Sequence, residues 1–353
     1  PTMPDTKLGL TSIDDDNDAA ATTIDTQPDL DNAKNPFRFS SRSPILSGLL
    51  FTIVIVASSL FIASIPSAMA PPTTEPSHSL HSRSTTEVSV PSVEELESYV
   101  QLAYAAFCED EELGNWTCQW CLDQEFQITS ILYNEITKTR GYVGYLPSQN
   151  LTIASFRGSY GHAENWWLNL RLGTTTNFYN VRVRTGWLVA YQALQEQLFV
   201  ALQQNHDLCP SCSTLVTTGH SLGATIGALA ALDVKLSNSL PWIERVEMRT
   251  FGMPRVGHKD FAELFQANVD ASFRVVHYRD IVPHYPVRPW HVFPYHHVGT
   301  ELWVPQKEFN GTLKHCDGSG EDQQCSNSVP IWQWDPDDHN IYMGLQNNDC
   351  GRK

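Results

Sequence analysis

The sequence predicts an α/β fold in which a mostly parallel central sheet carries helices on both faces. One observation is an alternation: helical segments at 186–203, 221–236 and 260–266 are interleaved with β-like apolar runs at 126–132, 141–146, 151–156, 214–217, 246–251, 273–277 and 300–304. Alternating strands and helices form parallel sheets that are covered on both sides. The other is the passage from strand to helix near residue 221, where Gly219 and Gly223 flank Ser221 and indicate a tight turn.

The composition is that of an acidic globular protein. The chain has 353 residues, of which 41% are hydrophobic, and a formal net charge of -16. Nucleic acids and anionic membrane surfaces repel an acidic protein, so we expect neither as the main partner. Any contact with lipid must therefore be apolar.

The first 91 residues are expected to precede the folded domain. Residues 1–44 are polar and Asp-rich, and they predict a disordered tail. Residues 45–65 are uncharged and about as long as the roughly 20 residues that cross a bilayer as a helix. The basic residues Lys34, Arg38 and Arg42 precede this segment, so the positive-inside rule places the tail in the cytoplasm and the rest of the chain across the membrane. Residues 66–91 are rich in Pro, Ser and Thr and indicate an extended stalk.

Two fates remain open for the segment at 45–65. Ala68 and Ala70 resemble the small residues of a signal-peptide cleavage site, but Pro71 directly afterwards disfavours cleavage. The apolar run also exceeds the roughly 7–15 residues of a signal-peptide core. An uncleaved signal anchor is therefore favoured over a cleaved signal peptide.

The folded domain is expected at residues 92–353. Ser92 followed by Glu95 is a capping box that marks the start of a helix. Apolar residues then recur at helical spacing as far as Phe107. This first helix is expected to pack on the core.

The cysteines and glycosylation motifs indicate the secretory pathway. An even number of cysteines, eight, fits a disulfide framework. The close pairs Cys118/Cys121 and Cys209/Cys212 could instead form a Cys₄ zinc site. Three N-glycosylation acceptors, at Asn115, Asn150 and Asn310, favour the oxidising compartments in which disulfides persist. We therefore expect disulfides and no metal.

Ser221 is the predicted nucleophile. It lies in Gly-His-Ser-Leu-Gly between an apolar strand and a helix rich in Ala and Leu, which is the context of the nucleophile elbow in the α/β-hydrolase fold. Glycines are required on both sides because neighbouring backbone comes too close for side chains. The helix N-terminus behind the serine favours a developing negative charge. The sequence therefore predicts a serine esterase.

A serine hydroxyl needs a base and an acid that orients the base. Asp280 is the best-placed acid because it follows the strand at 273–277, at the carboxyl end where α/β active sites lie. Asp233 lies three turns along the helix after Ser221 and is expected to be a solvated surface acid. For the base, position favours His339, in a polar loop, over His296 and His297, which precede the strand at 300–304.

The oxyanion of the reaction needs two donors. One is the backbone N–H of Leu222, and the other is expected from Ser159, in the loop after the strand at 151–156.

A lid is expected directly after this loop. One apolar helical face gathers four residues, which are Ala163, Trp166, Trp167 and Leu170. Such a helix can cover an apolar site in water and open at a lipid–water interface. A permanently docked surface helix explains the same periodicity.

These motifs together resemble the fungal-type class 3 lipases, a family of triacylglycerol lipases, mono- and diacylglycerol lipases and feruloyl esterases. The resemblance covers about residues 93–350, and it is carried by Ser-Phe-Arg-Gly-Ser159, Glu-Asn-Trp166, Thr-Gly-His-Ser-Leu-Gly223, Thr-Phe-Gly-Met-Pro-Arg-Val-Gly257, Asp280-Ile-Val-Pro and Asp-His339. It implies Ser221, Asp280 and His339 as the triad, Ser159 as the oxyanion residue and the helix around Trp166 as the lid. It also implies four disulfides, which are Cys108–Cys350, Cys118–Cys121, Cys209–Cys212 and Cys316–Cys325.

The expected activity is hydrolysis of acylglycerol esters without a cofactor, by a monomer that meets lipid through its lid. The chain departs from the family at Gly161 and His162, where a Ser followed by a bulky apolar residue is common, so strong interfacial activation does not follow from the resemblance. A feruloyl or short-chain esterase is an alternative. A catalytically silent lipid-binding homologue is another, but it predicts a damaged triad, and every triad position here is filled.

Overall fold

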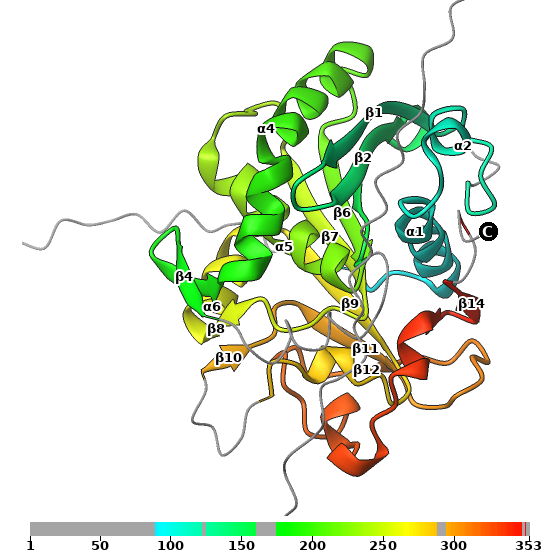
Figure 1. Cartoon of the computed structure of the whole chain (residues 1–353), viewed down its shortest axis with the longest axis vertical. Coiled ribbons are helices and arrows are strands. Elements are labelled where there is room, and N and C mark those ends of the chain that lie inside the picture. The colour runs from blue at the N-terminus through cyan, green and yellow to red at the C-terminus, as the bar shows by residue number, and fades with distance from the viewer. Residues whose placement is uncertain (1–88, 122–124, 160–173, 288–293, 348–349, 351–353) are drawn as a thin grey trace, which may run out of the picture. The chain divides into compact units, whose positions relative to one another are not determined.

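The computed structural model describes residues 89–121, 125–159, 174–287, 294–347 and 350, and Figure 1 shows their arrangement. The expected tail, the apolar segment at 45–65 and the predicted lid residues Ala163, Trp166, Trp167 and Leu170 lie outside this part of the chain. Within the described residues, no helix combines the length and the apolarity needed to cross a membrane.

The domain is built on an eight-stranded sheet with the order β1-β2-β3-β6-β7-β9-β11-β12. The strands are β1 (Gln127–Asn134), β2 (Thr139–Leu146), β3 (Leu151–Phe156), β6 (Thr214–His220), β7 (Arg245–Phe251), β9 (Ala271–His277), β11 (Thr300–Val304) and β12 (Lys314–His315). The five strands β3, β6, β7, β9 and β11 pair in parallel, while β1, β2 and β12 add antiparallel edges. The predicted fold, an α/β-hydrolase fold with a mostly parallel sheet, is confirmed.

Helices cover both faces of this sheet. Helix α1 (Val93–Ala105) packs on one face, and α4 (Thr185–Leu208), α5 (Leu222–Ser237) and α6 (Lys259–Asn268) lie on the other (Figure 1). Helix α1 begins where the sequence predicts, because the Ser92 hydroxyl accepts a hydrogen bond from the Glu95 amide at 3.2 Å. A short helix, α2 (Asp110–Gly114), follows it.

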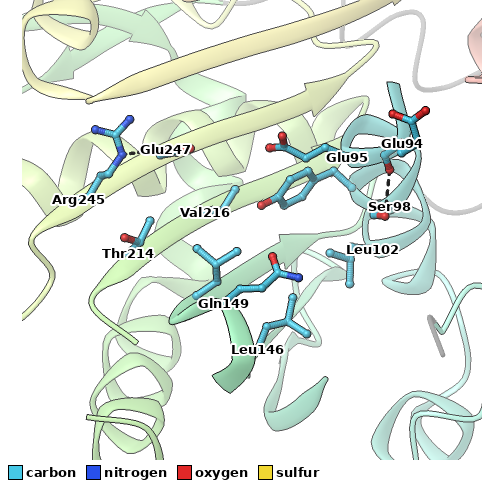
Figure 2. Close-up of a pocket in the computed structure, with 12 residues that line it drawn as sticks. Glu94, Glu95, Ser98, Leu102, Leu146, Gln149, Thr214, Val216, Arg245 and Glu247 are labelled. Atoms are coloured by element: carbon cyan, nitrogen blue, oxygen red, sulfur yellow. Dashed lines mark hydrogen bonds and ion pairs between the residues drawn. The ribbon is translucent and has the colours of Figure 1, made fainter. Parts of the chain in front are cut away.

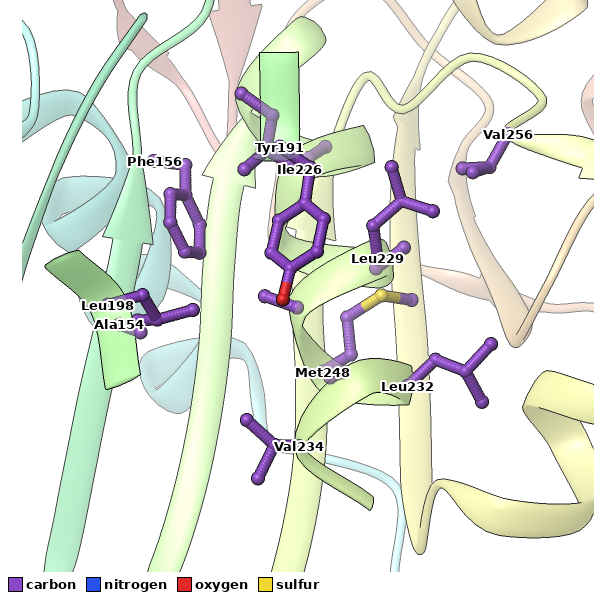
Figure 3. Packing of buried hydrophobic residues seen from close by; sticks show 14 of the residues in the cluster. Ala154, Phe156, Tyr191, Leu198, Ile226, Leu229, Leu232, Val234, Met248 and Val256 are labelled. Carbon is purple, nitrogen blue, oxygen red and sulfur yellow. The ribbon is translucent and has the colours of Figure 1, made fainter. Parts of the chain in front are cut away.

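Two apolar cores lie on the two faces of the sheet. Figure 3 shows the core beneath α4 and α5, where Phe156, Tyr191, Leu229 and Met248 are fully buried. Helix α5 is buried on nearly every side, which explains its run of small and apolar residues. Burying each large apolar side chain contributes about 1.5–3 kcal/mol to folding. The helix that carries the predicted nucleophile is therefore held by packing along its whole length.

The prediction that Asp233 is a solvated surface acid is wrong. Its side chain is 2% exposed and accepts hydrogen bonds from the Tyr179 hydroxyl at 2.5 Å and the Gln195 amide at 2.6 Å, and from the Tyr191 hydroxyl. The helical pattern could not reveal this, because the hydroxyl groups arrive from α4 and a β-hairpin that are distant in sequence. These bonds join α5 to α4.

Smaller elements complete the domain. A four-stranded sheet has the order β10-β8-β5-β4, and it comprises β4 (Thr175–Phe178), β5 (Val181–Arg184), β8 (Gly257–His258) and β10 (Tyr295–His296). A hairpin forms from β13 (Ile341–Tyr342) and β14 (Leu345–Gln346). Single 3₁₀ turns lie at η1 (Pro147–Gln149), η2 (Val282–His284), η4 (Ser326–Ser328), η5 (Ile331–Gln333) and η6 (Asp337–Asn340).

All eight cysteines lie in four disulfides, Cys108–Cys350, Cys118–Cys121, Cys209–Cys212 and Cys316–Cys325. These are the pairings that the family resemblance implies. Each of the two close pairs closes its own disulfide, so the alternative of a shared Cys₄ zinc site is wrong.

Candidate active site

Ser221 lies in a strained turn between β6 and α5. Its backbone has φ 60° and ψ -125°, a region that non-glycine residues rarely adopt and that costs about 1–3 kcal/mol. The Ser221 amide donates to the carbonyl of Phe251 on β7 at 3.0 Å, which ties the turn to the end of the neighbouring strand. Strain of this kind persists only where the surroundings enforce it, and it is typical of a nucleophile elbow.

The two glycines of the motif are there because backbone surrounds them. A Cβ on Gly223 would lie 1.9 Å from the carbonyl oxygen of Phe156, and a Cβ on Gly219 would lie 2.5 Å from the backbone of Gly223. Strand β3, which ends at Phe156, therefore presses directly against the start of α5. The close approach that the sequence predicts is present at both positions.

The loop after β3 also contacts the elbow. A Cβ on Gly158 would lie 2.9 Å from the carbonyl oxygen of His220 and 3.2 Å from the Cβ of Ser221. Ser159, the next residue, is half-buried, and Leu222 is the first residue of α5. The two predicted oxyanion residues therefore lie in the two segments that flank Ser221.

Asp280 is fully buried and receives three hydrogen bonds. Its Oδ2 accepts from the Nδ1 of His339 at 2.8 Å and from the hydroxyl of Tyr342, and its Oδ1 accepts from the Val282 amide at 2.8 Å. This carboxylate is therefore fixed in place by its donors, and its contact with Nδ1 sets the orientation of the imidazole.

His339 lies beside the elbow. The ring of His220, the residue before Ser221, is 4.4 Å from the His339 ring, and its Nε2–H donates to the His339 carbonyl at 2.8 Å. Burial, followed by the charge of His339, holds the pKa of His220 well below its ordinary value, so His220 is neutral and serves as a donor. A Cβ on Gly252 would lie 2.9 Å from Cε1 of His339. His339 is thus packed between the residues that surround Ser221.

The other two histidines considered as the base have different roles. His297 is 3% exposed and donates from Nε2 to the carbonyl of Pro283 at 2.7 Å. Burial, followed by the charge of Arg274, holds the pKa of His297 well below its ordinary value. Nδ1 of His296 bonds to the carbonyl of His297. The histidine that Asp280 contacts is His339, as position in the sequence and the family resemblance indicate.

Two features of the site were missed by sequence reasoning. Tyr342 is fully buried and donates to the predicted catalytic acid; its position three residues after His339 was the available signal. Arg255 forms a two-bond ion pair with Glu321 at 2.8 Å, and its Nη1 donates to the carbonyls of His284 at 2.6 Å and Pro286 at 3.0 Å. This arginine therefore holds the loop that follows Asp280.

A second loop is bound to the acid loop. Asp335 donates its amide to the carbonyl of Arg279 at 2.9 Å and accepts at its own carbonyl from Ile281 at 3.4 Å. Trp334 stacks on His284 with ring centroids 4.2 Å apart. The loop that leads to His339 is therefore paired with the loop that carries Asp280.

A cavity of about 580 Å³ lies at the opposite end of the sheet (Figure 2). It is lined by Glu94 and Ser98 of α1 and by Thr214 and Arg245, which begin β6 and β7. The elbow lies at the other ends of these strands. This cavity is therefore separate from the candidate site.

The described residues contain two clusters of metal-ligand types, and disulfides account for the cysteines in both. Two groups of Cys and Glu are close enough to share an ion, which are Cys108, Cys118 and Cys350, and Glu301, Cys316 and Cys325. All of their sulfur atoms lie in disulfides, whereas metals bind free thiolates. The chemistry available at Ser221 is that of a serine with an imidazole and a carboxylate nearby.

Comparisons with known proteins agree with this geometry. Residues 153–290 match the family model described as lipase (class 3). A lipase of Rhizopus niveus is 27% identical over 267 residues, covering 73% of this chain and 65% of that protein, so the chain spans less than two thirds of this relative's length. Secreted mono- and diacylglycerol lipase 1 of Fusarium solani is 28% identical, covering 62% of this chain and 67% of that protein. A solved triacylglycerol lipase, whose catalytic centre is described as a serine protease triad, is 28% identical with a TM-score of 0.64, covering 72% of this chain and 95% of that chain.

Proposed function

We propose that this chain, which belongs to the class 3 lipase family, is a serine hydrolase that cleaves acylglycerol esters. The observation that carries the proposal is the strained Ser221 turn beside a buried His339 whose Nδ1 lies 2.8 Å from Asp280. A buried carboxylate on one imidazole nitrogen leaves the other nitrogen to act as a base. The lipase relatives support acylglycerols as the substrate class.

The proposed mechanism assigns one role to each group. Ser221 Oγ attacks the ester carbonyl, His339 takes the proton and returns it to the leaving alcohol, and Asp280 holds the imidazole in the productive tautomer. The backbone N–H of Leu222, with the amide and hydroxyl of Ser159, stabilises the oxyanion. Water then cleaves the acyl-enzyme by the same route. One oxyanion donor is worth about 3–4 kcal/mol of barrier.

We further propose that residues 92–353 form the catalytic domain and act outside the cytosol as a monomer. The four disulfides support an oxidising compartment, and the three glycosylation acceptors Asn115, Asn150 and Asn310 are exposed. Residues 45–65 act as an anchor or signal, and the Trp face of residues 163–170 acts as a lid. The N-terminal sequence of the mature protein tests cleavage after Ala70, and removal of N-glycans tests the acceptors.

Labelling with a fluorophosphonate probe tests the nucleophile. Wild-type protein is expected to be labelled, and Ser221→Ala is expected to lose the label while keeping its fold by circular dichroism. Absence of labelling in folded wild-type protein contradicts the proposal and favours the silent homologue.

Relative rates on three esters test the substrate class. We expect triolein and p-nitrophenyl butyrate to be hydrolysed and methyl ferulate to be poor. A clear preference for methyl ferulate would contradict the lipase assignment and favour a feruloyl esterase, while the assignment of Ser221 as the nucleophile would stand.

A further inference from the structure

Two large apolar side chains project into solvent near the candidate active site. Ile331 is 63% exposed and Trp332 is 80% exposed, and both lie on the 3₁₀ turn η5. We call this pair the Ile331–Trp332 tip. Exposing large apolar side chains to water is costly, so two adjacent residues that do so, one of them a tryptophan, indicate a partner.

The tip is held rigidly. The backbone amide of Gln333 donates to Pro330 at 2.8 Å, and the indole of Trp334 donates to the carbonyl of Val329 at 3.0 Å. Trp334 itself is stacked on His284 with an interplanar angle of 3°. The loop around Ile331 and Trp332 is therefore held by its own hydrogen bonds and by the stacking of Trp334, and this folded loop directs the two side chains outward.

The tip lies in the loop that leads to His339. Trp334 contacts His284 in the loop after Asp280, and Asp335 is bonded to both Arg279 and Ile281. His339 follows Asp335 by four residues. The tip therefore stands on the loop that carries His339, and this loop is bonded to the one that carries Asp280.

Among the described residues, the other exposed aliphatic side chains lack an exposed tryptophan beside them. Val189, Val200 and Leu208 stand apart from one another along α4, and Ile136 lies in the turn between β1 and β2. Single exposed apolar side chains are common on soluble proteins. The tip differs because it joins an indole to an aliphatic side chain beside the catalytic loops.

The surrounding charge selects the kind of partner. Asp337 is exposed, Asp335 is half-buried, and the whole chain carries a formal charge of -16. An anionic surface is repelled by these carboxylates. A neutral or zwitterionic surface accepts an indole at its polar–apolar boundary, where tryptophan is enriched.

We propose that the Ile331–Trp332 tip inserts into a neutral or zwitterionic lipid surface and so holds the active site against it. The inference rests on the proposed function, which it deepens. An enzyme whose substrate lies within a lipid phase needs a surface that binds lipid close to its catalytic residues.

The experiment compares four full-length proteins, which are wild type, Trp332→Ser, Trp332→Phe and Ile136→Ser. Ile136→Ser is the matched control, because Ile136 is 93% exposed in a turn that carries none of the candidate catalytic residues. Hydrolysis of triolein droplets coated with phosphatidylcholine is measured against hydrolysis of dissolved p-nitrophenyl butyrate. All four proteins keep the same N-terminal segment, so differences between them report the substituted side chain.

Trp332→Ser is expected to need about tenfold more droplet surface for half-maximal rate, since an indole no longer enters the lipid. Its kcat/KM on dissolved p-nitrophenyl butyrate is expected to stay within about twofold of wild type. Trp332→Phe keeps an apolar ring and is expected to restore most of the droplet rate. Adsorption of the same variants to the droplets in a Ser221→Ala background is expected to follow the same order, and it needs no catalysis.

Three results would overturn the proposal. The first is that Trp332→Ser and Ile136→Ser behave alike on droplets. The second is that Trp332→Ser loses activity by the same factor on both substrates, which would indicate a structural role. The third is that light scattering shows a wild-type dimer that Trp332→Ser dissociates, which would make a second copy of this chain the partner. If wild-type protein hydrolyses neither ester, the proposed function fails, while the adsorption order still decides the role of the tip.

Discussion

The two sides of the candidate site are held together by different physics. Ser221 stands on a strand and a helix that are packed into the core, and its turn is shaped by backbone contact at Gly219 and Gly223. Asp280 and His339 stand on loops that are joined by hydrogen bonds, and Arg255, paired with Glu321, holds the loop after Asp280. The nucleophile side should therefore be sensitive to volume, and the acid–base side to charge and hydrogen bonding.

The largest expected effect is on the nucleophile side. Gly223→Ala places a Cβ 1.9 Å from the Phe156 carbonyl oxygen, so β3 and α5 must separate. We expect a loss of at least about 3 kcal/mol in the free energy of unfolding, together with loss of ester hydrolysis. Denaturant unfolding and rates on p-nitrophenyl butyrate measure both.

Gly227→Ala, one turn further along the same helix, is the matched control. The nearest atom to its Cβ would be 3.5 Å away, which is ordinary contact. Alanine is also the better helix former, by about 0.5–1 kcal/mol. Equal damage from both substitutions would show that helix α5 resists any added volume and that the elbow is not special.

The next effect is expected on the acid–base side. Arg255 and Glu321 are buried, with side chains 4% and 9% exposed, so Glu321→Gln leaves a guanidinium charge without its counter-charge. Removing one partner of a buried pair costs about 3–5 kcal/mol. We expect kcat to fall as well, because Arg255 also holds the carbonyl oxygens of the loop after Asp280.

Glu263→Gln serves as the control for Glu321→Gln. The Lys259–Glu263 pair is 69% and 64% exposed, and such surface pairs contribute about 0–1 kcal/mol. A Glu321→Gln protein as stable as this control would mean that the acid loop does not depend on the buried pair.

A smaller effect is expected from Tyr342→Phe, which removes one of the three donors to Asp280. A hydrogen bond to a charged group is worth about 1.5–3 kcal/mol, so kcat/KM is expected to fall roughly tenfold with little change in KM. Tyr142→Phe removes another buried hydroxyl, which donates to the Leu102 carbonyl of α1 and not to Asp280. It should lower stability without lowering kcat; a loss of kcat in Tyr142→Phe alone would reverse the interpretation.

The smallest effect is a pH dependence of stability. Burial, followed by the charge of Arg255, lowers the pKa of His284 to about 3, so this ring stays neutral in the native state. In the unfolded chain it binds a proton near pH 6.5. Acidification therefore favours the unfolded state, and this stability is present above pH 6.5 and is lost as the pH falls towards 3.

Between pH 6.5 and 5.5 the loss from this one histidine is expected to be about 1 kcal/mol. His284→Phe keeps a ring against Trp334 but cannot be protonated, so its free energy of unfolding is expected to fall less steeply over this interval. Identical slopes in denaturant titrations of the two proteins would exclude His284 as a source of the pH dependence.

The same contrast explains how much the sequence could predict. The motif of the elbow is local, because the strand, the glycines, the serine and the helix follow one another within residues 214–237. The parallel strands β3, β6, β7 and β9 followed for the same reason, since each is an apolar run and helices α4, α5 and α6 lie between them in the sequence.

The acid–base side is not local, so the sequence left it partly open. Position favoured His339 over His297 without deciding between them, because the difference is a contact with Asp280 for one ring and with the Pro283 carbonyl for the other. Asp233 was misjudged in the same way. Tyr342 and the Arg255–Glu321 pair went unnoticed, because their partners are brought together only by folding.

The central claim is that the two sides act as one catalytic unit, and a double-mutant cycle tests it most directly. We would measure kcat on p-nitrophenyl butyrate for wild type, Ser221→Ala, His339→Ala and the double variant. Each single substitution is expected to lower kcat by a factor on the order of 10⁶, and the double variant no further, because a serine without its base and a base without its serine are equally inactive. Losses that multiply in the double variant, or a His339→Ala protein within tenfold of wild type, would contradict the account.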